Sequence, residues 1–285
     1  KEMQFDIIFV GNKTSLGYIK SERSFSVMIY HGIGLKQSYY TDLSKKMDLI
    51  CVESSSRNKN LQNMGFNSFE TGFTKLDFLK KPDNIKIRKL SHPRVLYAPT
   101  FFPSSLHKTI PYLKKLTDFK IQIKLHHFFW TNPRYIKICS ALKEEIKDLD
   151  HISLAPFEEY NILKFFPSSD LLISDFSSTI FEFLKLNRPI IQATYFNRRF
   201  KYKLFPKLLN KRMDQARESS INFTLKCDSP RILYDKINIS LSNINALDTQ
   251  RLLACEAFLG NINDNASQKV LDAIRSNGIP IGDAK

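Results

Sequence analysis

The sequence predicts an α/β protein made of two Rossmann-like domains that face a cleft. Three observations lead to this prediction: short apolar strands alternate with helical segments, the alternation occurs in two blocks, and a polar linker separates them. Strands that are apolar throughout are typical of parallel sheets with helices on both faces. We therefore expect an N-terminal domain over residues 1–88 and a C-terminal domain over residues 89–285, which ends in a helical tail.

The N-terminal block contains four expected strands and two expected helices. The strands are FDIIFVG, FSVMIY, DLICVES and FETGF, and the helices cover residues 38–46 and 57–64. Gly65 follows the second helix and is a natural stop. Residues 80–93 contain two prolines and an excess of charge, which is typical of a linker.

The C-terminal block continues with five expected strands: RVLYAPT, FKIQIKLHH, ISL, LLIS and PIIQAT. Helices are expected over residues 106–117, 133–149, 160–166 and 179–186. From about Thr249 the tail is expected to be helical, with an apolar stripe formed by Leu252, Leu253 and Phe258.

Composition limits the class of protein. The formal net charge of +15 favours polyanionic partners: nucleic acid, anionic lipid or phosphate-bearing substrates. No stretch approaches 18 consecutive apolar residues, and the first residues do not resemble a secretion signal. The four cysteines are far apart and form no CxxC motif, so we expect free thiols in a reducing cytosol. The chain does not begin with Met, so we expect a trimmed N-terminus that lacks a membrane-docking part.

The stretch SDLLISDFSSTIFEFLKLNRPII is expected to be a strand, a serine-rich turn and a helix. Such a turn lies at the carboxyl edge of a parallel sheet, where ligands bind in open α/β folds. One interpretation is a phosphate site, in which Ser177, Ser178 and Thr179 add hydroxyl donors to the backbone N–H groups. The other is a capping box, in which Thr179 caps the helix and Glu182 returns to the cap N–H.

The same stretch resembles the signature of the CDP-glycerol glycerophosphotransferase family, which builds teichoic acids and related capsules. The matching residues are Asp170, Asp175, Ser177, Ser178, Phe181 and Pro189. Four further segments resemble family motifs in the same order along the chain: YHGIGLK, TGFTKLDFL, LYAPTF and KLHHF. The chain departs from the family at Thr74, Lys75, His127, Phe176 and Glu182, and after Ile191 the family's aspartate-containing pattern is not clear.

The resemblance implies a two-domain, glycosyltransferase-B-like fold with the nucleotide in the C-terminal domain. It implies transfer of a phospho-polyol, glycerol phosphate in the family, from a CDP-activated donor to a hydroxyl, with release of CMP and with no cofactor. His31, followed by Gly32, would then be the base that activates the acceptor hydroxyl. His126 would contact the donor diphosphate or protonate the leaving phosphate. For each histidine the alternative, a purely structural side chain that is hydrogen-bonded to a loop, stays open.

Other charged residues have a place in this hypothesis. Lys124 would add positive charge beside His126, and Asp175 would orient the serine loop. Lys36 is either a phosphate contact or a solvated helix residue, and Arg198 is a candidate phosphate contact. The basic stretch over residues 197–212 is either a polyanion contact or a solvated helix. We expect no metal site, because no DxD motif or ligand cluster occurs.

Adjacent residues on an extended strand point to opposite faces, so His126 and His127 are not expected to share one metal. His127 is expected to be a packing or surface residue. Asp170 and Asp175 are likewise not expected to form an acid pair, and Asp170 is expected to hold the start of its strand.

Two alternatives remain. The first is a glycosyltransferase of the same fold that uses a CMP- or UDP-sugar. The second is a basic nucleic-acid-binding protein, although no helix-turn-helix or RNA-binding motif occurs and no nucleic acid is expected as a partner. For the transferase we expect a polysaccharide or lipid-linked acceptor, an anionic membrane surface as a partner, and a cytoplasmic location on the inner face of the cell membrane.

Overall fold

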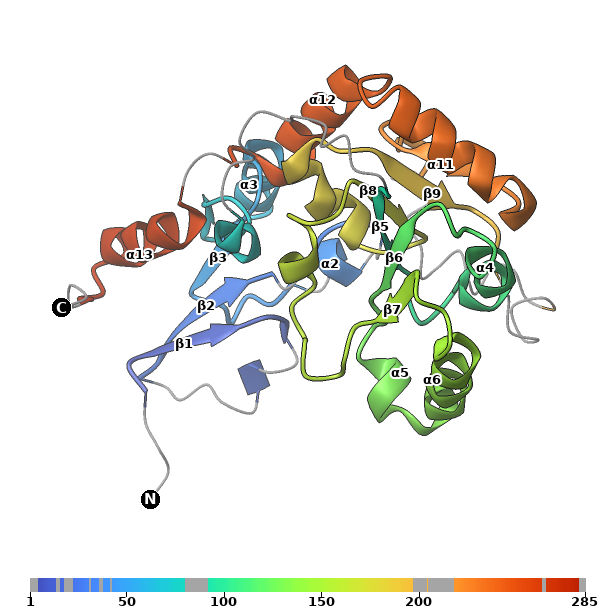
Figure 1. The fold of residues 1–285 in the computed structure, drawn as a ribbon. Helices are drawn as coiled ribbons and strands as arrows, with labels where there is room; N and C mark the ends of the chain where they lie inside the picture. The colour runs from blue at the N-terminus through green and yellow to red at the C-terminus, as the bar shows by residue number, and fades with distance from the viewer. Residues whose placement is uncertain are drawn as a thin grey trace. The chain divides into compact units, whose positions relative to one another are not determined.

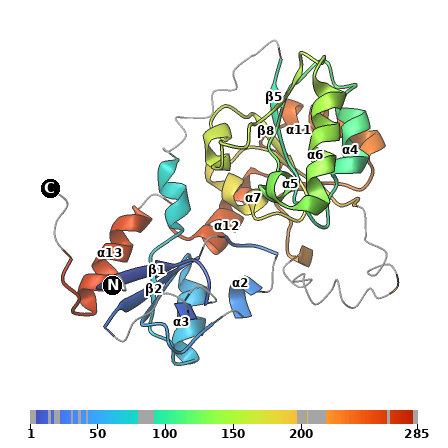
Figure 2. The same cartoon turned by 90° about the horizontal axis from the view of Figure 1, so that it is seen from below.

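The computed structural model describes residues 5–13, 16–17, 23–30, 32–35, 38–41, 43–79, 92–196, 204, 218–262 and 265–281. The chain divides into two compact units (Figures 1 and 2). Unit 1 combines Lys1–Lys80 with Leu253–Lys285, and unit 2 is the continuous segment Lys81–Leu252. The predicted α/β class with parallel sheets is confirmed in both units.

Unit 1 is built on a four-stranded parallel sheet in the order β1-β2-β3-β4. The strands are β1 (Ile7–Val10), β2 (Phe25–Ile29), β3 (Leu49–Val52) and β4 (Ser68–Glu70). The helices are α2 (Ser38–Thr41), α3 (Ser55–Asn63), the 3₁₀ helix η1 (Thr74–Phe78) and α13 (Ala266–Ser276). Each of the four strands was predicted from its apolar run.

The two central strands of this sheet, β2 and β3, are covered on both faces, which explains why they are mainly apolar. On one face Leu61 of α3 packs with Met28 and Ile50. On the other face Val270, Ala273 and Ile274 of α13 pack with Val27, Leu49 and Cys51. Successive strand residues alternate between these two clusters, as the period of two in a β-strand requires.

The last 33 residues differ from the predicted arrangement, which placed them in the C-terminal domain. In the structure Leu253–Lys285 belongs to unit 1. The physical reason is α13, whose apolar stripe completes the second face of the unit 1 sheet. The chain returns there through Gly260, which has φ +67° and lies so close to Glu53 that a Cβ atom would be 2.2 Å from its carbonyl oxygen.

Unit 2 is built on a six-stranded parallel sheet in the order β10-β9-β8-β5-β6-β7. The strands are β5 (Arg94–Ala98), β6 (Lys120–Ile123), β7 (Ile152–Leu154), β8 (Leu171–Ser174), β9 (Ile190–Ala193) and β10 (Leu225–Cys227). The helices are α4 (Leu106–Leu113), α5 (Phe128–Thr131), α6 (Pro133–Ile146), η2 (Ile162–Phe165), α7 (Thr179–Glu182), η3 (Phe183–Leu186), η4 (Pro230–Ile232), α11 (Leu233–Ser242) and the start of α12 (Asp248–Leu259), which belongs to unit 1 from Leu253 onward.

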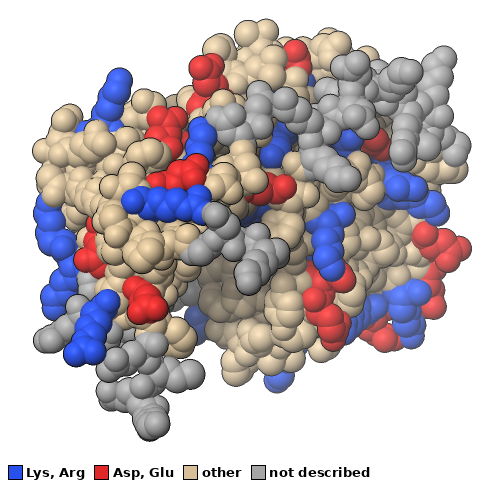
Figure 3. Space-filling view, turned by 90° about the vertical axis from the view of Figure 1, so that its left-hand side faces the viewer, with Lys and Arg blue, Asp and Glu red and all other residues tan. Residues whose placement is uncertain are grey.

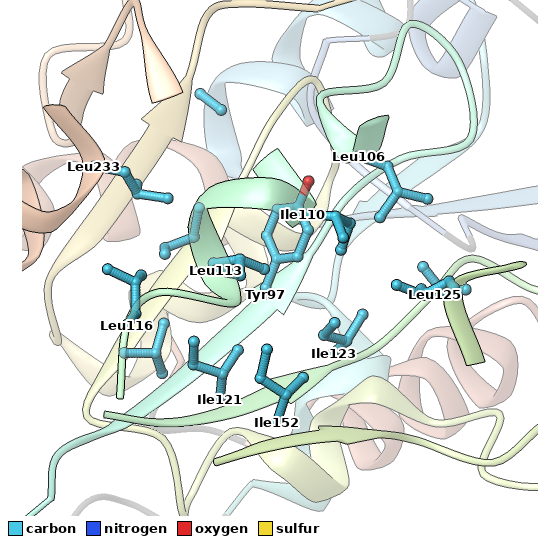
Figure 4. Close-up of a cluster of buried hydrophobic side chains, with 14 of the residues drawn as sticks. Tyr97, Leu106, Ile110, Leu113, Leu116, Ile121, Ile123, Leu125, Ile152 and Leu233 are labelled. Carbon is cyan, nitrogen blue, oxygen red and sulfur yellow. The ribbon is translucent and has the colours of Figure 1, made fainter. Parts of the chain in front are cut away.

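The core of unit 2 lies between the sheet and helices α4, α6 and α11. Figure 4 shows Leu106, Ile110 and Leu113 of α4 over Tyr97 and the strand side chains around it. Strand residues that point the other way, such as Leu96 and Leu172, are also fully buried. The sheet is therefore covered on both faces, as its sequence predicted.

The tail differs from the prediction in its apolar stripe. Leu252 and Leu253 are 53% and 62% exposed, whereas Ala254, Cys255 and Leu259 are buried. The buried face of α12 is therefore a different one from the predicted apolar stripe. It includes Arg251, whose guanidinium donates to the Asn187 side chain and to the Ile244 carbonyl. All four cysteines are free, as predicted, and the structure buries each of them.

Candidate active site

The strand order of unit 2 reverses between β5 and β8, and the candidate site is the carboxyl edge at this point. After β5 the chain continues to β6 and β7 on one side, and after β8 it continues to β9 and β10 on the other. This is the strand order of a doubly wound dinucleotide-binding sheet, in which ligands bind outside the carboxyl ends at the reversal. Here the two loops that meet are residues 99–105 after β5 and Asp175–Ser178 after β8.

Asp175 joins these two loops. Its side chain is fully buried and accepts hydrogen bonds from the Thr100 N–H at 2.8 Å, the Ser105 N–H at 2.9 Å and the Ser105 hydroxyl at 2.9 Å. Burial raises the pKa of Asp175 to about 7, and the hydrogen bonds from Ser105 and Thr100 act in the opposite direction. Sequence reasoning placed Asp175 in the donor site as the residue that orients the serine loop. In the structure its carboxylate bonds the loop after β5, and its part in a donor site stays a prediction.

The serine turn presents two half-buried hydroxyls. The Ser177 Oγ accepts from the Thr179 N–H at 3.3 Å and lies 2.9 Å from the Thr179 hydroxyl. The Ser178 hydroxyl donates to the Glu182 carboxylate at 3.2 Å. Thr179 and Glu182 themselves are buried, at 7% and 1% exposure, so they support the turn from behind.

The predicted capping box is wrong in its details. Helix α7 begins after Ser178, which is the N-cap and makes no side-chain cap bond. Glu182 bonds the Ser178 hydroxyl, and the cap that sequence reasoning assigned to Thr179 lies one residue earlier. Short α7 continues directly into η3, so the predicted helix over residues 179–186 is one α-helical turn followed by one 3₁₀ turn.

His126 and His127 lie in a loop, because β6 ends at Ile123. Their rings stack with centroids 4.3 Å apart, so the prediction that they point to opposite faces is wrong. The His126 Nδ1 accepts from the Phe128 N–H at 3.2 Å, which places the proton of the neutral ring on Nε2 and makes that nitrogen a donor. His127 is exposed, as predicted for a surface residue.

Lys124 follows β6 and is only 7% exposed. Its ammonium donates to the Leu125 carbonyl at 3.1 Å. Burial lowers the pKa of Lys124, and the nearby Glu159 carboxylate acts in the opposite direction. An anionic ligand close to this ammonium would favour its charged form.

The loop after β5 connects these residues, and it contains the site residues that sequence reasoning missed. Thr100 and Ser105 bond Asp175, while the ring of Phe101 packs on His126 at a centroid distance of 4.7 Å. Since β6, β5 and β8 are successive neighbours, their carboxyl ends lie roughly 5 Å apart each. His126 and the serine turn therefore follow two strands, β6 and β8, that both pair with β5, and they lie at the same edge of the sheet.

Two features of unit 1 bear on the remaining predicted residues. Gly32 is buried in the loop after β2, and Gly34 in the same loop has φ +113°. Tyr30, at the end of β2, packs against the guanidinium of Arg57, which pairs with the Glu53 carboxylate at 3.0 Å. The residue from which the loop leaves the sheet, Tyr30, is therefore fixed by its packing against Arg57. His31, Lys36, Arg198 and all of the basic stretch 197–212 except Leu204 lie outside the described residues.

Asp170 has the structural role predicted for it. Its carboxylate accepts from the Arg94 N–H at 2.8 Å, at the start of β5 and at the opposite end of β8 from Asp175. Within the described part of the chain, no group of three or more His, Cys, Asp or Glu side chains is placed to hold a metal ion. Among the described helices, none is both long and apolar enough to cross a bilayer.

Comparison with known proteins gives a family and a fold. The family described as CDP-Glycerol:Poly(glycerophosphate) glycerophosphotransferase matches residues 6–204. No curated protein matches the chain. Among solved structures, the wall teichoic acid polymerase TagF is 17% identical, with 91% of this chain and 70% of that chain covered and a TM-score of 0.62.

Two further structures are similar. A TagF variant soaked with CDPG is 16% identical, with 95% of this chain and 71% of that chain covered and a TM-score of 0.65. The other is a structure described as a "putative UDP-N-acetylglucosamine 2-epimerase from Listeria monocytogenes". It is 15% identical over 96% of this chain and 74% of that chain, with a TM-score of 0.55. The predicted glycosyltransferase-B-like fold is confirmed.

Proposed function

The chain belongs to the CDP-Glycerol:Poly(glycerophosphate) glycerophosphotransferase family, and from this premise we propose how its residues carry out the transfer. The donor is CDP-glycerol, and the acceptor is a hydroxyl of a cell-surface polysaccharide or of a lipid-linked polymer. The acceptor oxygen forms a bond to the glycerol-bearing phosphorus, the bond from that phosphorus to the CMP oxygen breaks, and CMP leaves. The hydroxyl proton passes to a base, for which we propose His31.

The observation that carries this proposal is the connected edge of the unit 2 sheet. Asp175 holds the loop after β5, and Phe101 of that loop packs on His126. We propose that His126 Nε2–H donates to the diphosphate, and that the Ser177 and Ser178 hydroxyls bind its other end. A donor that is already in place, such as the His126 Nε2–H, can stabilise the charge that develops on the leaving phosphate, and the serine hydroxyls can rotate from Glu182 and Thr179 toward it.

Lys124 contributes charge in this scheme. Its ammonium is held in a buried position by the Leu125 carbonyl. A diphosphate placed near it would favour the charged form and oppose the effect of burial on its pKa. We propose that Gly32 and Lys36, which lie in a segment that resembles a family motif, contact the acceptor or the phosphates, and that Arg198 does so as a forked donor.

We also propose that the enzyme works on the inner face of the cell membrane. The net charge of +15 supports attraction to an anionic surface. The segment over residues 197–212 supplies seven Lys and Arg side chains and no acidic one. On the face shown in Figure 3, described Lys and Arg side chains lie among Asp and Glu side chains, so that face is mixed in charge.

Calorimetric titration tests the proposal. The purified protein is titrated with CMP, CDP, CDP-glycerol, UDP and a mixed-sequence DNA oligomer at moderate salt. We expect selective binding of cytidine nucleotides, lost or weakened at least about tenfold by His126→Ala and by Ser177→Ala. His127→Ala is the matched control, because His127 is the exposed neighbour whose ring stacks on His126.

The other outcomes separate the alternatives. Selective binding of UDP would favour a sugar transferase of the same fold. Binding of DNA with no binding of any nucleotide would overturn the transferase proposal. If cytidine nucleotides bind but His126→Ala and His127→Ala are equally affected, the assignment of His126 is wrong while the donor class stands.

A further inference from the structure

A second concave site lies entirely within unit 1. It is a cavity of about 590 Å³ at the carboxyl ends of β1 and β2, between the sheet, η1 and α13. Cavities of roughly 300–1,000 Å³ are the usual size of sites for small molecules. Tyr30, one of its lining residues, immediately precedes His31 in the sequence.

The sheet and α13 give the cavity an apolar floor. Phe9 and Ile29 lie on the sheet face whose other residues α13 covers, and Val270 and Leu271 come from α13 itself. Phe9 is 51% exposed and Phe78 of η1 is 79% exposed, although both are large apolar side chains. Exposed phenyl rings grouped around an apolar cavity are typical of a binding site.

The polar part of the lining is small and has one sign of charge. It consists of Tyr30, Thr74, Lys75 and Ser267. Lys75 is the one charged residue among these lining side chains, and no carboxylate or side-chain amide occurs among them. Asp77, in the same 3₁₀ helix, is bonded to the start of α13 through the Ala266 and Ser267 N–H groups and the Ser267 hydroxyl.

We propose that this cavity binds the hydrocarbon chain of a phosphorylated, lipid-linked acceptor, with Lys75 paired to the phosphate of that lipid. The inference rests on the proposed function, since it names the part of the acceptor that unit 1 recognises. The apolar floor removes the hydrocarbon chain from water, which is favourable in proportion to the apolar surface that is buried. A single cation with hydroxyls beside it suits an anionic head group at the rim.

The lining argues against the other ligand classes. A sugar ring or a nucleobase has several donors and acceptors that must be paired when buried, and carboxylate and amide side chains usually pair them. The lining side chains carry three hydroxyls and one ammonium, and the Ser267 hydroxyl already donates to Asp77. A hydrocarbon chain needs no such partners. A concave cavity also suits one chain, whereas association with a bilayer surface uses an exposed face.

Titration of the protein with farnesyl phosphate, below the concentration at which farnesyl phosphate forms micelles, tests the inference. Farnesol and inorganic phosphate are the probes for the two halves of the ligand. We expect saturable binding of farnesyl phosphate, weaker binding of farnesol and no binding of inorganic phosphate. Lys75→Ala should weaken farnesyl phosphate about tenfold and leave farnesol unchanged.

Two variants test the apolar part. Phe78→Ser should weaken both farnesyl ligands about tenfold. Leu271→Trp, which fills the cavity from a half-buried position, should abolish saturable binding of both. The matched controls are Phe69→Ser and Lys59→Ala, an exposed phenylalanine and an exposed lysine of unit 1 outside the lining, and both should bind like the parent protein.

Equal binding by Phe78→Ser, Leu271→Trp and the parent protein would overturn the inference. So would binding only to phosphatidylglycerol vesicles with no saturable binding of farnesyl phosphate, since that result indicates a bilayer surface as the partner. Calorimetry with CDP-glycerol on the same samples keeps the two proposals apart. If the protein binds CDP-glycerol but not farnesyl phosphate, the cavity proposal is wrong and the transferase proposal is unaffected. If it binds farnesyl phosphate but not CDP-glycerol, the cavity proposal holds and the transferase proposal does not.

Discussion

At the scale of single residues, Asp175 combines complete burial with an ionisable side chain. Its carboxylate receives three hydrogen bonds from Thr100 and Ser105, and burial nevertheless raises its pKa to about 7. A carboxylate so placed holds its loop rigidly and accepts no further donor easily. Asp175 is therefore a positioning residue for the loop that carries Phe101.

The stability of unit 2 should depend on pH through Asp175. Its folded-state pKa of about 7 lies above the ordinary value of 3.8, so the folded protein binds this proton more tightly than the unfolded chain. The stability that it contributes is present below the ordinary pKa and is lost as pH rises through about 7. The change amounts to at most about 4 kcal/mol, because one pKa unit corresponds to about 1.4 kcal/mol.

Urea unfolding of the parent protein and of Asp175→Asn measures this effect. Fluorescence of Trp130, the single tryptophan of the chain, reports on unit 2. Asparagine does not titrate and cannot accept from both backbone N–H groups, so the variant should be less stable. Its deficit should narrow as pH rises from about 4 to about 8. A deficit that is constant over this range would contradict the raised pKa.

At the scale of elements, the position of α13 on the unit 1 sheet depends on a close backbone contact at Gly260 and on a helix cap from Asp77. Gly260 allows the turn before α13, and the Asp77 carboxylate accepts the first N–H groups of that helix. Gly260 and Gly278 both have a positive φ, but a Cβ atom at Gly260 would meet the Glu53 carbonyl at 2.2 Å, whereas at Gly278 nothing lies within 4 Å.

These glycines form a matched pair. Gly278→Ala should cost about 1 kcal/mol in the free energy of unfolding of unit 1, because an L-residue is strained at positive φ. Gly260→Ala should cost more, since the backbone of one of the two segments must also move. Thermal unfolding followed by circular dichroism measures both, and equal shifts in Tm would show that the contact with Glu53 is not restrictive.

Asp77→Ala tests the other feature. Loss of this acceptor leaves the first N–H groups of α13 to water and to the Asn265 cap, which bonds the Gln268 N–H at 3.1 Å. We expect a loss of about 1 kcal/mol. Asp272→Ala is the control, because Asp272 lies on the same helix and makes only exposed side-chain contacts. Equal losses in the two variants would argue against a capping role.

Most elements of the fold could be predicted from the sequence, because most strands, such as β1, β3, β5 and β8, are mainly apolar runs. Strand β10 was missed, since it has three residues with Lys226 in the middle. Helix α11 was missed because polar residues such as Asn238 interrupt its apolar pattern. The end of β6 was placed too late because apolar Leu125 continues the run past the last paired residue.

The candidate site was predictable only in part. The serine turn and His126 were found from local motifs. The roles of Thr100, Phe101 and Ser105 were not, because they depend on contacts between residues far apart in the sequence: 75 residues separate Thr100 from Asp175 and 70 separate Ser105 from it. No local pattern reveals that β5 and β8 are neighbours. For the same reason the helical tail was expected in the C-terminal domain, whereas its residues from Leu253 onward belong to unit 1.

At the scale of the whole molecule, the two units have separate cores and should respond separately to a local change. Cys51 in unit 1 is buried beneath α13, and burial raises the pKa of its thiol to about 12. Cys227 is buried in unit 2. Ile274→Asp would place a carboxylate in the interface of α13 with the sheet, where Ile274 is fully buried.

In Ile274→Asp we expect Cys51 to react faster with a thiol reagent, by at least about tenfold, because a buried charge of this kind costs several kcal/mol and opens α13 from the sheet. Cys227 should react as slowly as in the parent protein. Mass spectrometry of the labelled peptides distinguishes the two sites. Parallel acceleration at both cysteines would show that the units unfold together.

The discontinuity of unit 1 has a consequence for biosynthesis. Unit 2 is one uninterrupted segment, whereas the sheet of unit 1 obtains a covering helix from residues 266–276. On the ribosome the strands β1 to β4 emerge first, with one apolar face bare for as long as the chain takes to reach α13. Unit 2 can therefore reach its native state before unit 1 does, and the nascent N-terminal sheet is the part of this protein that most needs a chaperone.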